Sequence, residues 1–177
     1  MPNQKDDALN MLVDIAVKEV GTIEDPGHNN AGKDIVEYQE ATWLVPGPWA
    51  WCAAFTCWVL KEWVHTPHVK LMLNLTTFDD AEKWRCKDAR AFGWEEWAKK
   101  RNLQVFPETA LAKKGDIVVF DFSHIGIVIE DQKTTKTSIK TVEGNTNGAG
   151  TRDSNKGDGV WRKTRVPSLT KSYIRLL

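Results

Sequence analysis

The architecture of this 177-residue chain follows from one apolar segment, Pro48-Trp49-Ala50-Trp51-Cys52-Ala53-Ala54-Phe55-Thr56-Cys57-Trp58-Val59-Leu60. Proline is tolerated where a helix begins but not inside it, and neither glycine nor a second proline follows Pro48 in this segment. The segment therefore predicts a helix that begins near Pro48 and holds Cys52 in its first turn. Nearly every side chain from Trp49 to Leu60 is apolar, so we expect the helix to be buried on all sides.

A thiol in the first turn of a helix is a candidate nucleophile. The free amides and the dipole at a helix N-terminus stabilise a negative charge by up to about 2 kcal/mol. Reactive cysteines also need a histidine close by, so Cys52 is a nucleophile only if an imidazole lies beside it. Cys57, deeper in the helix, is interpreted as a small buried apolar residue. Cys86 is interpreted as a partly exposed free thiol.

Composition excludes several functional classes. The 24 basic residues balance the 24 acidic ones, which gives no electrostatic argument for binding nucleic acid or an anionic membrane. Three cysteines without regular spacing argue against a disulfide framework. The N-terminal residues lack the pattern of a signal peptide, and no apolar run is long enough to span a bilayer. We expect one domain over residues 1–177, a monomer made in the cytoplasm.

The order of the periodic segments predicts an α+β fold. Helical patterns occupy residues 7–20, a short segment around Ile35 and Tyr38, and residues 77–101, where Gly93 bends or divides the helix. β-branched and aromatic runs separated by short turns follow. These predicted strands cover residues 117–120, 125–129, 138–142, 160–165 and 173–177. Helices first and strands afterwards indicate that the buried cysteine helix packs on a C-terminal antiparallel sheet.

Of the four histidines, His124 is the one that a regular strand would hold in a fixed orientation. It opens a predicted strand, and strand alternation places it on one face with Gly126 and Val128. After the next strand, Glu143 and Asn145 stand two residues apart with Gly144 between them. On a continuing strand both would lie on one side, and either could fix the imidazole as the third member of a triad does.

Several blocks of the chain together resemble the CHAP domains, the cysteine, histidine-dependent amidohydrolases/peptidases of the papain-like superfamily. These blocks are Trp51–Phe55, Gly115–Phe120, His124–Val128, Glu143–Asn147 and Gly159–Arg162. Glu24–Gly27, with Asn30, Ile35 and Tyr38, is similar to the N-terminal loop and helix of that family. The resemblance implies a papain-like fold and an enzyme that cuts amide bonds in the stem peptide of peptidoglycan. Such an enzyme would act on the cell wall or in the periplasm after its release from the cytoplasm.

The resemblance also implies roles for individual residues. Cys52 would be the nucleophile, His124 the general base and then acid, and Glu143 the orienter, with Asn145 assisting. The substrate would contact Trp51, Glu24, Asn30 and Trp161. Two other interpretations remain open: a papain-like acyltransferase or transglutaminase, and a non-catalytic module that binds the wall.

The chain departs from the family pattern at three places. Ser123 precedes the histidine where glycine is frequent. Residues 41–51 hold no carboxylate, so the calcium-binding loop of some members is absent, and we expect neither a metal nor another cofactor. The nearest glutamine before the cysteine is Gln39, too distant to match the family's oxyanion donor. The backbone amide of Cys52 is then the one donor that the sequence proposes for the oxyanion.

Overall fold

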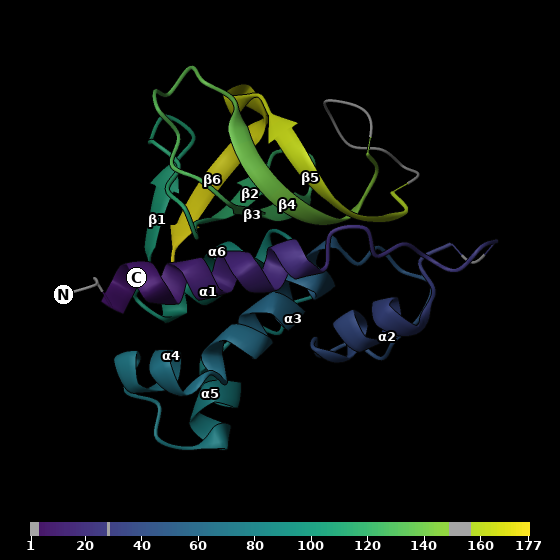
Figure 1. Ribbon diagram of the computed structural model, residues 1–177, viewed down its shortest axis with the longest axis horizontal. Helices are drawn as coiled ribbons and strands as arrows, with labels where there is room; N and C mark the ends of the chain where they lie inside the picture. The colour runs from purple at the N-terminus through teal and green to yellow at the C-terminus, as the bar shows by residue number, and fades with distance from the viewer. Residues whose placement is uncertain (1–3, 28, 149–156) are drawn as a thin grey trace.

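The computed structural model of the chain describes residues 4–27, 29–148 and 157–177. Helices lie on one side of an antiparallel sheet, as Figure 1 shows. The helices are α1 (Gln4–Lys18), α2 (Lys33–Glu40), α3 (Cys52–Val64), α4 (Pro67–Met72), α5 (Phe78–Trp84), α6 (Gly93–Lys100) and the short 3-10 helix η1 (Pro167–Leu169). The strands are β1 (Gln104–Pro107), β2 (Ile117–Phe120), β3 (His124–Val128), β4 (Ile139–Thr146), β5 (Gly159–Arg165) and β6 (Thr170–Arg175). The predicted α+β fold class is confirmed.

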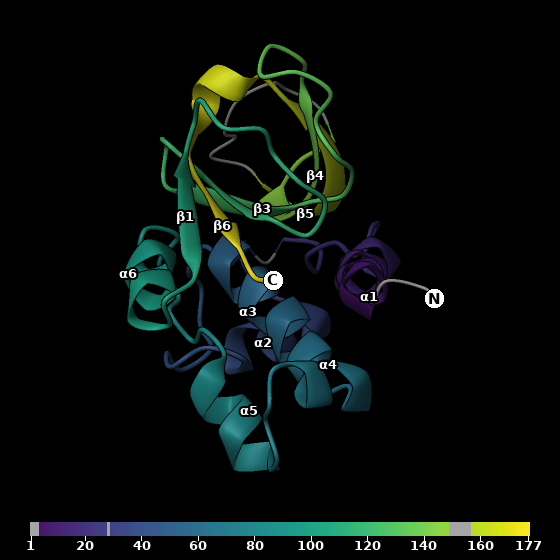
Figure 2. The same ribbon diagram turned by 90° about the vertical axis from the view of Figure 1, so that its left-hand side faces the viewer.

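The described strands form one strongly curled sheet with the order β1-β6-β2-β3-β4-β5 (Figure 2). Its two faces belong to different cores because successive side chains of a strand point in opposite directions. The face toward the helices carries Ile117, Val119, Ile125, Ile127 and Val142. The opposite face carries Val118, Phe120, Val128, Ile139 and Tyr173. The alternation predicted for Ile125, Ile127 and Val128 is therefore confirmed.

Helix α3 is the central helix of the fold. Ten of its thirteen residues are buried, as its continuous apolar sequence predicts. It packs against β3 and β4 on one side and against α1 and α2 on others. The indole N–H of Trp63 donates to the carbonyl of Ala8 at 2.7 Å and so joins α3 to α1. None of the described helices has the length and apolar character needed to cross a bilayer.

The start of α3 differs from the prediction, because the helix begins at Cys52 and not near Pro48. The backbone groups just before Cys52 are held by side chains outside the helix. Gln39 donates from its amide to the carbonyls of Gly47 and Trp49, at 2.8 and 3.2 Å. The amide N–H of Trp51 donates to Asn145 Oδ1 at 3.2 Å. Cys52 does lie in the first turn, as predicted.

Other differences concern the middle of the chain. The helical pattern predicted over residues 77–101 is divided into α5 and α6, and Gly93 begins the second, as the predicted division there requires; the break itself, residues 85–92, is longer than a bend at one glycine. The sequence did not predict α4 or the four-residue edge strand β1, which are short and lack a clear periodicity. The expectation for Cys86 is wrong, since only 1% of its surface is exposed. The segment after α5 folds back on α3, where the Cys57 thiol contacts the carbonyl of Asp88 at 3.6 Å.

Candidate active site

Cys52 is the first residue of α3, and 8% of its surface is exposed. The residue before it, Trp51, is the N-cap. The first amides of a helix have no partner inside the helix, so the N–H groups of this turn favour an anion at the thiol. Cys52 is thus a buried residue that keeps a small exposed surface at the start of α3.

His124 opens β3 beside this helix start, and 4% of its surface is exposed. Its Nε2 lies 2.8 Å from Glu143 Oε2, and Cys52 lies near enough for its charge to act on the imidazole. Burial on its own lowers the pKa of His124, but the charge of Cys52, and the hydrogen bond and charge of Glu143, raise this pKa to about 10. With Nε2 facing Glu143, the other ring nitrogen is the one available to Cys52.

Glu143 lies on β4 with no exposed surface. Besides His124, it accepts a hydrogen bond from the hydroxyl of Thr141 at 2.5 Å and one from Arg165 Nε at 3.0 Å. Burial on its own raises the pKa of Glu143, but the hydrogen bonds and charges of His124 and Arg165 lower this pKa to about 2. Gly126 makes room for the carboxylate, because a Cβ there would lie 2.5 Å from Glu143 Cγ.

Arg165 is the member of the site that sequence reasoning missed. It ends β5 with no exposed surface, and both carboxylate oxygens of Glu143 accept hydrogen bonds from it. The sequence pattern does place it at the end of a predicted strand. Its partner could not be identified from that pattern, because the pairing of β4 with β5 was unknown.

Asn145 does not lie beside Glu143 as the extended strand predicted. The β4–β5 pairing shifts register between Glu143 and Thr146, and Asn145 has a left-handed backbone with φ 53°. Its side chain turns toward the N-terminal loop, where Nδ2 donates to Asn30 Oδ1 at 3.0 Å. Its Oδ1 accepts from the Trp51 amide. Of the two candidate orienters, the structure places Glu143 against His124 and Asn145 against the start of α3.

The residues expected to contact the substrate occupy two different environments. Glu24 accepts a hydrogen bond from the Trp51 indole N–H at 2.8 Å and one from the Asn30 amide N–H at 2.7 Å. Trp51 is fully buried, so its ring has no surface to offer a substrate, in contrast to the expected contact. Trp161 is half-buried on β5, opposite Glu143 in the strand pairing, and its indole N–H donates to Asp158 at 3.0 Å. Trp161 therefore keeps a surface that a substrate can reach.

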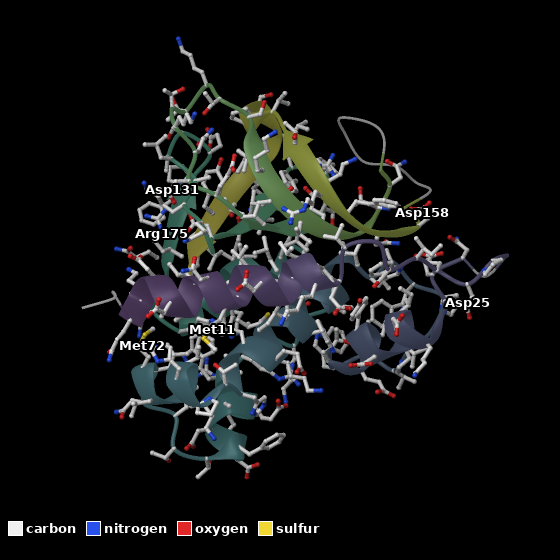
Figure 3. The ribbon with its side chains drawn as sticks, viewed as in Figure 1. Met11, Asp25, Met72, Asp131, Asp158 and Arg175 are labelled. Atoms are coloured by element: carbon white, nitrogen blue, oxygen red, sulfur yellow. The ribbon has the colours of Figure 1, made fainter. Side chains whose placement is uncertain are left out.

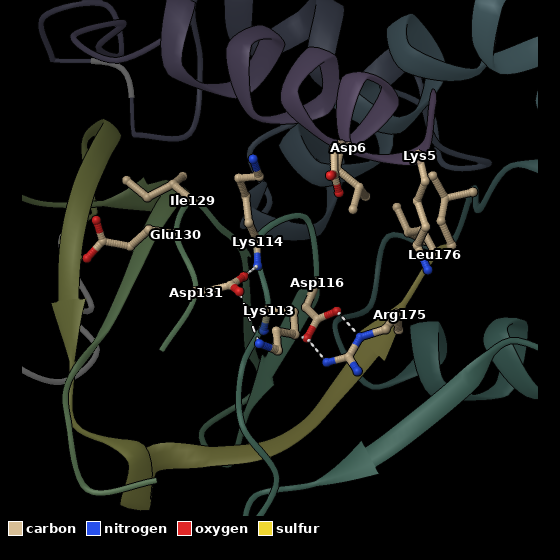
Figure 4. Close-up of a pocket in the computed structure, with 12 residues that line it drawn as sticks. Lys5, Asp6, Lys113, Lys114, Asp116, Ile129, Glu130, Asp131, Arg175 and Leu176 are labelled. Carbon is tan, nitrogen blue, oxygen red and sulfur yellow. Dashed lines mark hydrogen bonds and ion pairs between the residues drawn. The ribbon is translucent and has the colours of Figure 1, made fainter. Parts of the chain in front are cut away.

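A separate cavity lies away from these residues. It has a volume of about 660 Å³ and surrounds the bidentate ion pair of Asp116 and Arg175 (Figure 4). Figure 3 shows Arg175 and Asp131 on one side of the molecule and Asp25 and Asp158 on the other. The cavity borders the end of β3 opposite His124. Within residues 4–27, 29–148 and 157–177, no three His, Cys, Asp or Glu side chains are grouped to hold a metal ion.

Comparison with known families supports this assignment of the site. The family model of the CHAP domain matches residues 44–145, a segment that includes Cys52, His124, Glu143 and Asn145. No curated protein matches the chain. Arg165 lies outside the matched segment. Because the match covers more than half of the 177 residues, the chain belongs to the CHAP domain family of cysteine- and histidine-dependent amidohydrolases and peptidases.

Proposed function

We propose that the chain is a peptidoglycan hydrolase that cuts an amide bond in the stem peptide with Cys52, His124 and Glu143. One observation carries the proposal: three buried side chains lie next to one another, with the Cys52 thiol at the start of α3 acting on His124 through its charge and His124 Nε2 2.8 Å from the ionised carboxylate of Glu143. This order of nucleophile, base and orienter is the one that cysteine-dependent acyl transfer requires.

The first half of the reaction forms an acyl-enzyme. His124 holds the proton of Cys52, and the resulting thiolate attacks the carbonyl carbon of the amide. The oxyanion lies next to the Cys52 backbone N–H, which has no partner inside the helix. The imidazolium then gives its proton to the leaving nitrogen, and the C–N bond breaks. Gln39 is not available as a second donor, since its amide holds the carbonyls of Gly47 and Trp49.

The second half of the reaction releases the acyl-enzyme. Neutral His124 takes a proton from water, and the hydroxide attacks the thioester carbonyl. The C–S bond breaks, which returns the thiolate beside the imidazolium and leaves a free carboxylate on the product. The same steps serve an N-acetylmuramoyl-L-alanine amidase and an endopeptidase, because both cut an amide.

Digestion of purified sacculi tests this proposal. We expect the wild-type protein to release muropeptides with new free amino and carboxyl ends, which mass spectrometry identifies together with the bond that was cut. Cys52→Ala, or alkylation of Cys52 with iodoacetamide, abolishes this release, whereas EDTA does not. Cys86→Ala is the matched control: it removes another buried thiol and leaves the release intact at temperatures where the protein stays folded.

The same digestion separates the other interpretations. An acyltransferase or transglutaminase would give cross-linked or amine-bearing muropeptides in place of free ends. A wall-binding module would sediment with sacculi equally well as wild type and as Cys52→Ala, and neither would release muropeptides. Either result would overturn the hydrolase proposal.

A further inference from the structure

Glu143 carries a buried charge that needs a permanent partner. Its side chain has no exposed surface, and an unpaired charge in such a place is strongly unfavourable. During the proposed reaction, His124 alternates between imidazolium and neutral imidazole. In each neutral interval His124 no longer offsets the negative charge of Glu143.

Among the described residues, two other cations act on this carboxylate, and both lie on β5. Lys163 interacts with it through its charge, but its ammonium donates to the carbonyl of Asn147 at 2.7 Å. Arg165 contacts it directly: its Nε lies 3.0 Å from Oε1 and 3.2 Å from Oε2, and its Nη2 also donates to Oε2. A guanidinium keeps its charge at every pH at which a protein is folded. Cys52, on α3, is a further titratable group that acts on His124 through its charge.

The rings of Phe120 and Phe122 each contact both Arg165 and His124. The Arg165 guanidinium carbon lies 5.3 Å from the ring centre of Phe120 and 5.6 Å from that of Phe122. The His124 ring stacks on the same two residues, with centres 5.9 and 5.6 Å away and planes tilted by 22° and 10°. Both cations therefore have a fixed position relative to the carboxylate between them.

We propose that Arg165 is a positioning residue, which keeps Glu143 ionised and in place while His124 gains and loses its proton. The inference rests on the proposed function, in which His124 gains and loses a proton in each catalytic cycle. The electrostatic effect of Arg165 on Glu143 and His124 can be measured without a substrate.

Titration of His124 by NMR tests the proposal. Every protein in the series carries Cys52→Ser, so that the imidazole responds to Glu143 and Arg165 without the thiolate. The ring signal is assigned by its absence from a His124→Gln variant. The readout is the pH midpoint at which the imidazole loses its proton, and it does not depend on what the enzyme cuts.

We expect Arg165→Met and Arg165→Gln to raise this midpoint by on the order of one pH unit. Without Arg165, deprotonation of His124 would leave Glu143 without its contacting cation, so the proton is held more tightly. Glu143→Gln lowers the midpoint, because it removes the anion that stabilises the imidazolium. The two changes act in opposite directions, whereas a mere loosening of the site would make Arg165→Met resemble Glu143→Gln.

Two controls complete the series. Arg162→Met removes an exposed arginine from the same strand and leaves the midpoint unchanged. Arg165→Lys keeps the charge, so its midpoint lies closer to the wild-type value than that of Arg165→Met. Arg165→Gln keeps a hydrogen-bond donor and serves if Arg165→Met does not fold. A midpoint that stays unchanged or falls in Arg165→Gln, or a lysine variant that matches the uncharged ones, overturns the proposal.

Discussion

Glu143 shows at the scale of one residue how the site depends on pH. Its pKa is about 2 in the folded chain, against an ordinary value of 4.5. A carboxyl group whose pKa is lowered by folding contributes stability that is present above its ordinary pKa. That contribution is lost as the pH falls through the folded value. The Glu143 carboxylate, which orients the imidazole, thus also contributes stability that is lost in acid.

We predict that Glu143→Gln lowers the free energy of unfolding at pH 7 by about 3 kcal/mol or more, because Arg165 and His124 then lack their anion. The difference from wild type should shrink as the pH falls from about 4.5 toward 2, where the wild-type carboxylate is itself protonated. Urea unfolding at a series of pH values measures this. Glu96→Gln, at an exposed position of α6, should give a small difference throughout. A difference for Glu143→Gln that does not change with pH would contradict the prediction.

At the scale of the element, the start of α3 packs directly against the irregular end of β4. Gly144 packs directly on the helix: a Cβ there would lie 2.6 Å from Phe55 Cβ and 2.8 Å from Trp51 Cζ3. Asn145 follows with its left-handed backbone and holds the Trp51 amide. Ser123, before β3, also has a left-handed backbone with φ 61°, which glycine adopts at the least cost. That conformation explains why glycine suits this position in the family.

We predict that Gly144→Ala destabilises the fold by about 1–3 kcal/mol, because the added methyl group overpacks the contact between β4 and α3. Activity on sacculi should fall as well, since a shift of α3 moves the thiol relative to His124. Thermal unfolding and muropeptide release are the two measurements. Gly148→Ala is the matched control, because its Cβ would lie 3.6 Å from the nearest atom, in the Trp161 ring, an ordinary contact. Equal stability of the two variants would show that the contact has room for a methyl group.

At the scale of the whole molecule, the two ends of the sheet have different roles. One end holds His124 and Glu143. The other holds the buried carboxylate of Asp116, paired with Arg175, whose guanidinium lies 4.4 Å from the ring centre of Phe106. Arg175 ends β6, which pairs with both β1 and β2. This end therefore contributes to the stability of the sheet, far from the chemistry.

We predict that Arg175→Met lowers the free energy of unfolding by about 3 kcal/mol, because it leaves Asp116 as a buried charge without its cation. The rate of muropeptide release per folded molecule should not change, since the imidazole and the thiol keep their positions. Chemical unfolding and a rate measured at low temperature separate the two effects. Arg162→Met, which removes an exposed arginine of the same sheet, should leave both unchanged. A rate that falls with Arg175→Met would mean that the two ends are coupled.

Local patterns were enough for much of this molecule. The apolar run from Trp49 to Leu60 determined that α3 is buried, and alternating runs determined β2, β3 and β5 to within one residue, β6 to within three residues and β4 in its first half. The cysteine in a first turn and the histidine at a strand start followed from the same patterns. Each depends on interactions within a few residues of the chain, which periodicity and turn chemistry describe directly.

Tertiary structure alone decided how the site is completed. In the folded chain, Glu143 and not Asn145 lies beside the imidazole, and Arg165 binds Glu143. Cys86 is buried, and α3 begins at Cys52. These outcomes depend on strand register, on the bulge after Glu143 and on contacts such as that of Asn145 with Trp51, 94 residues apart. No local pattern encodes them, because a side chain's partner on another element is fixed only when the two elements pack.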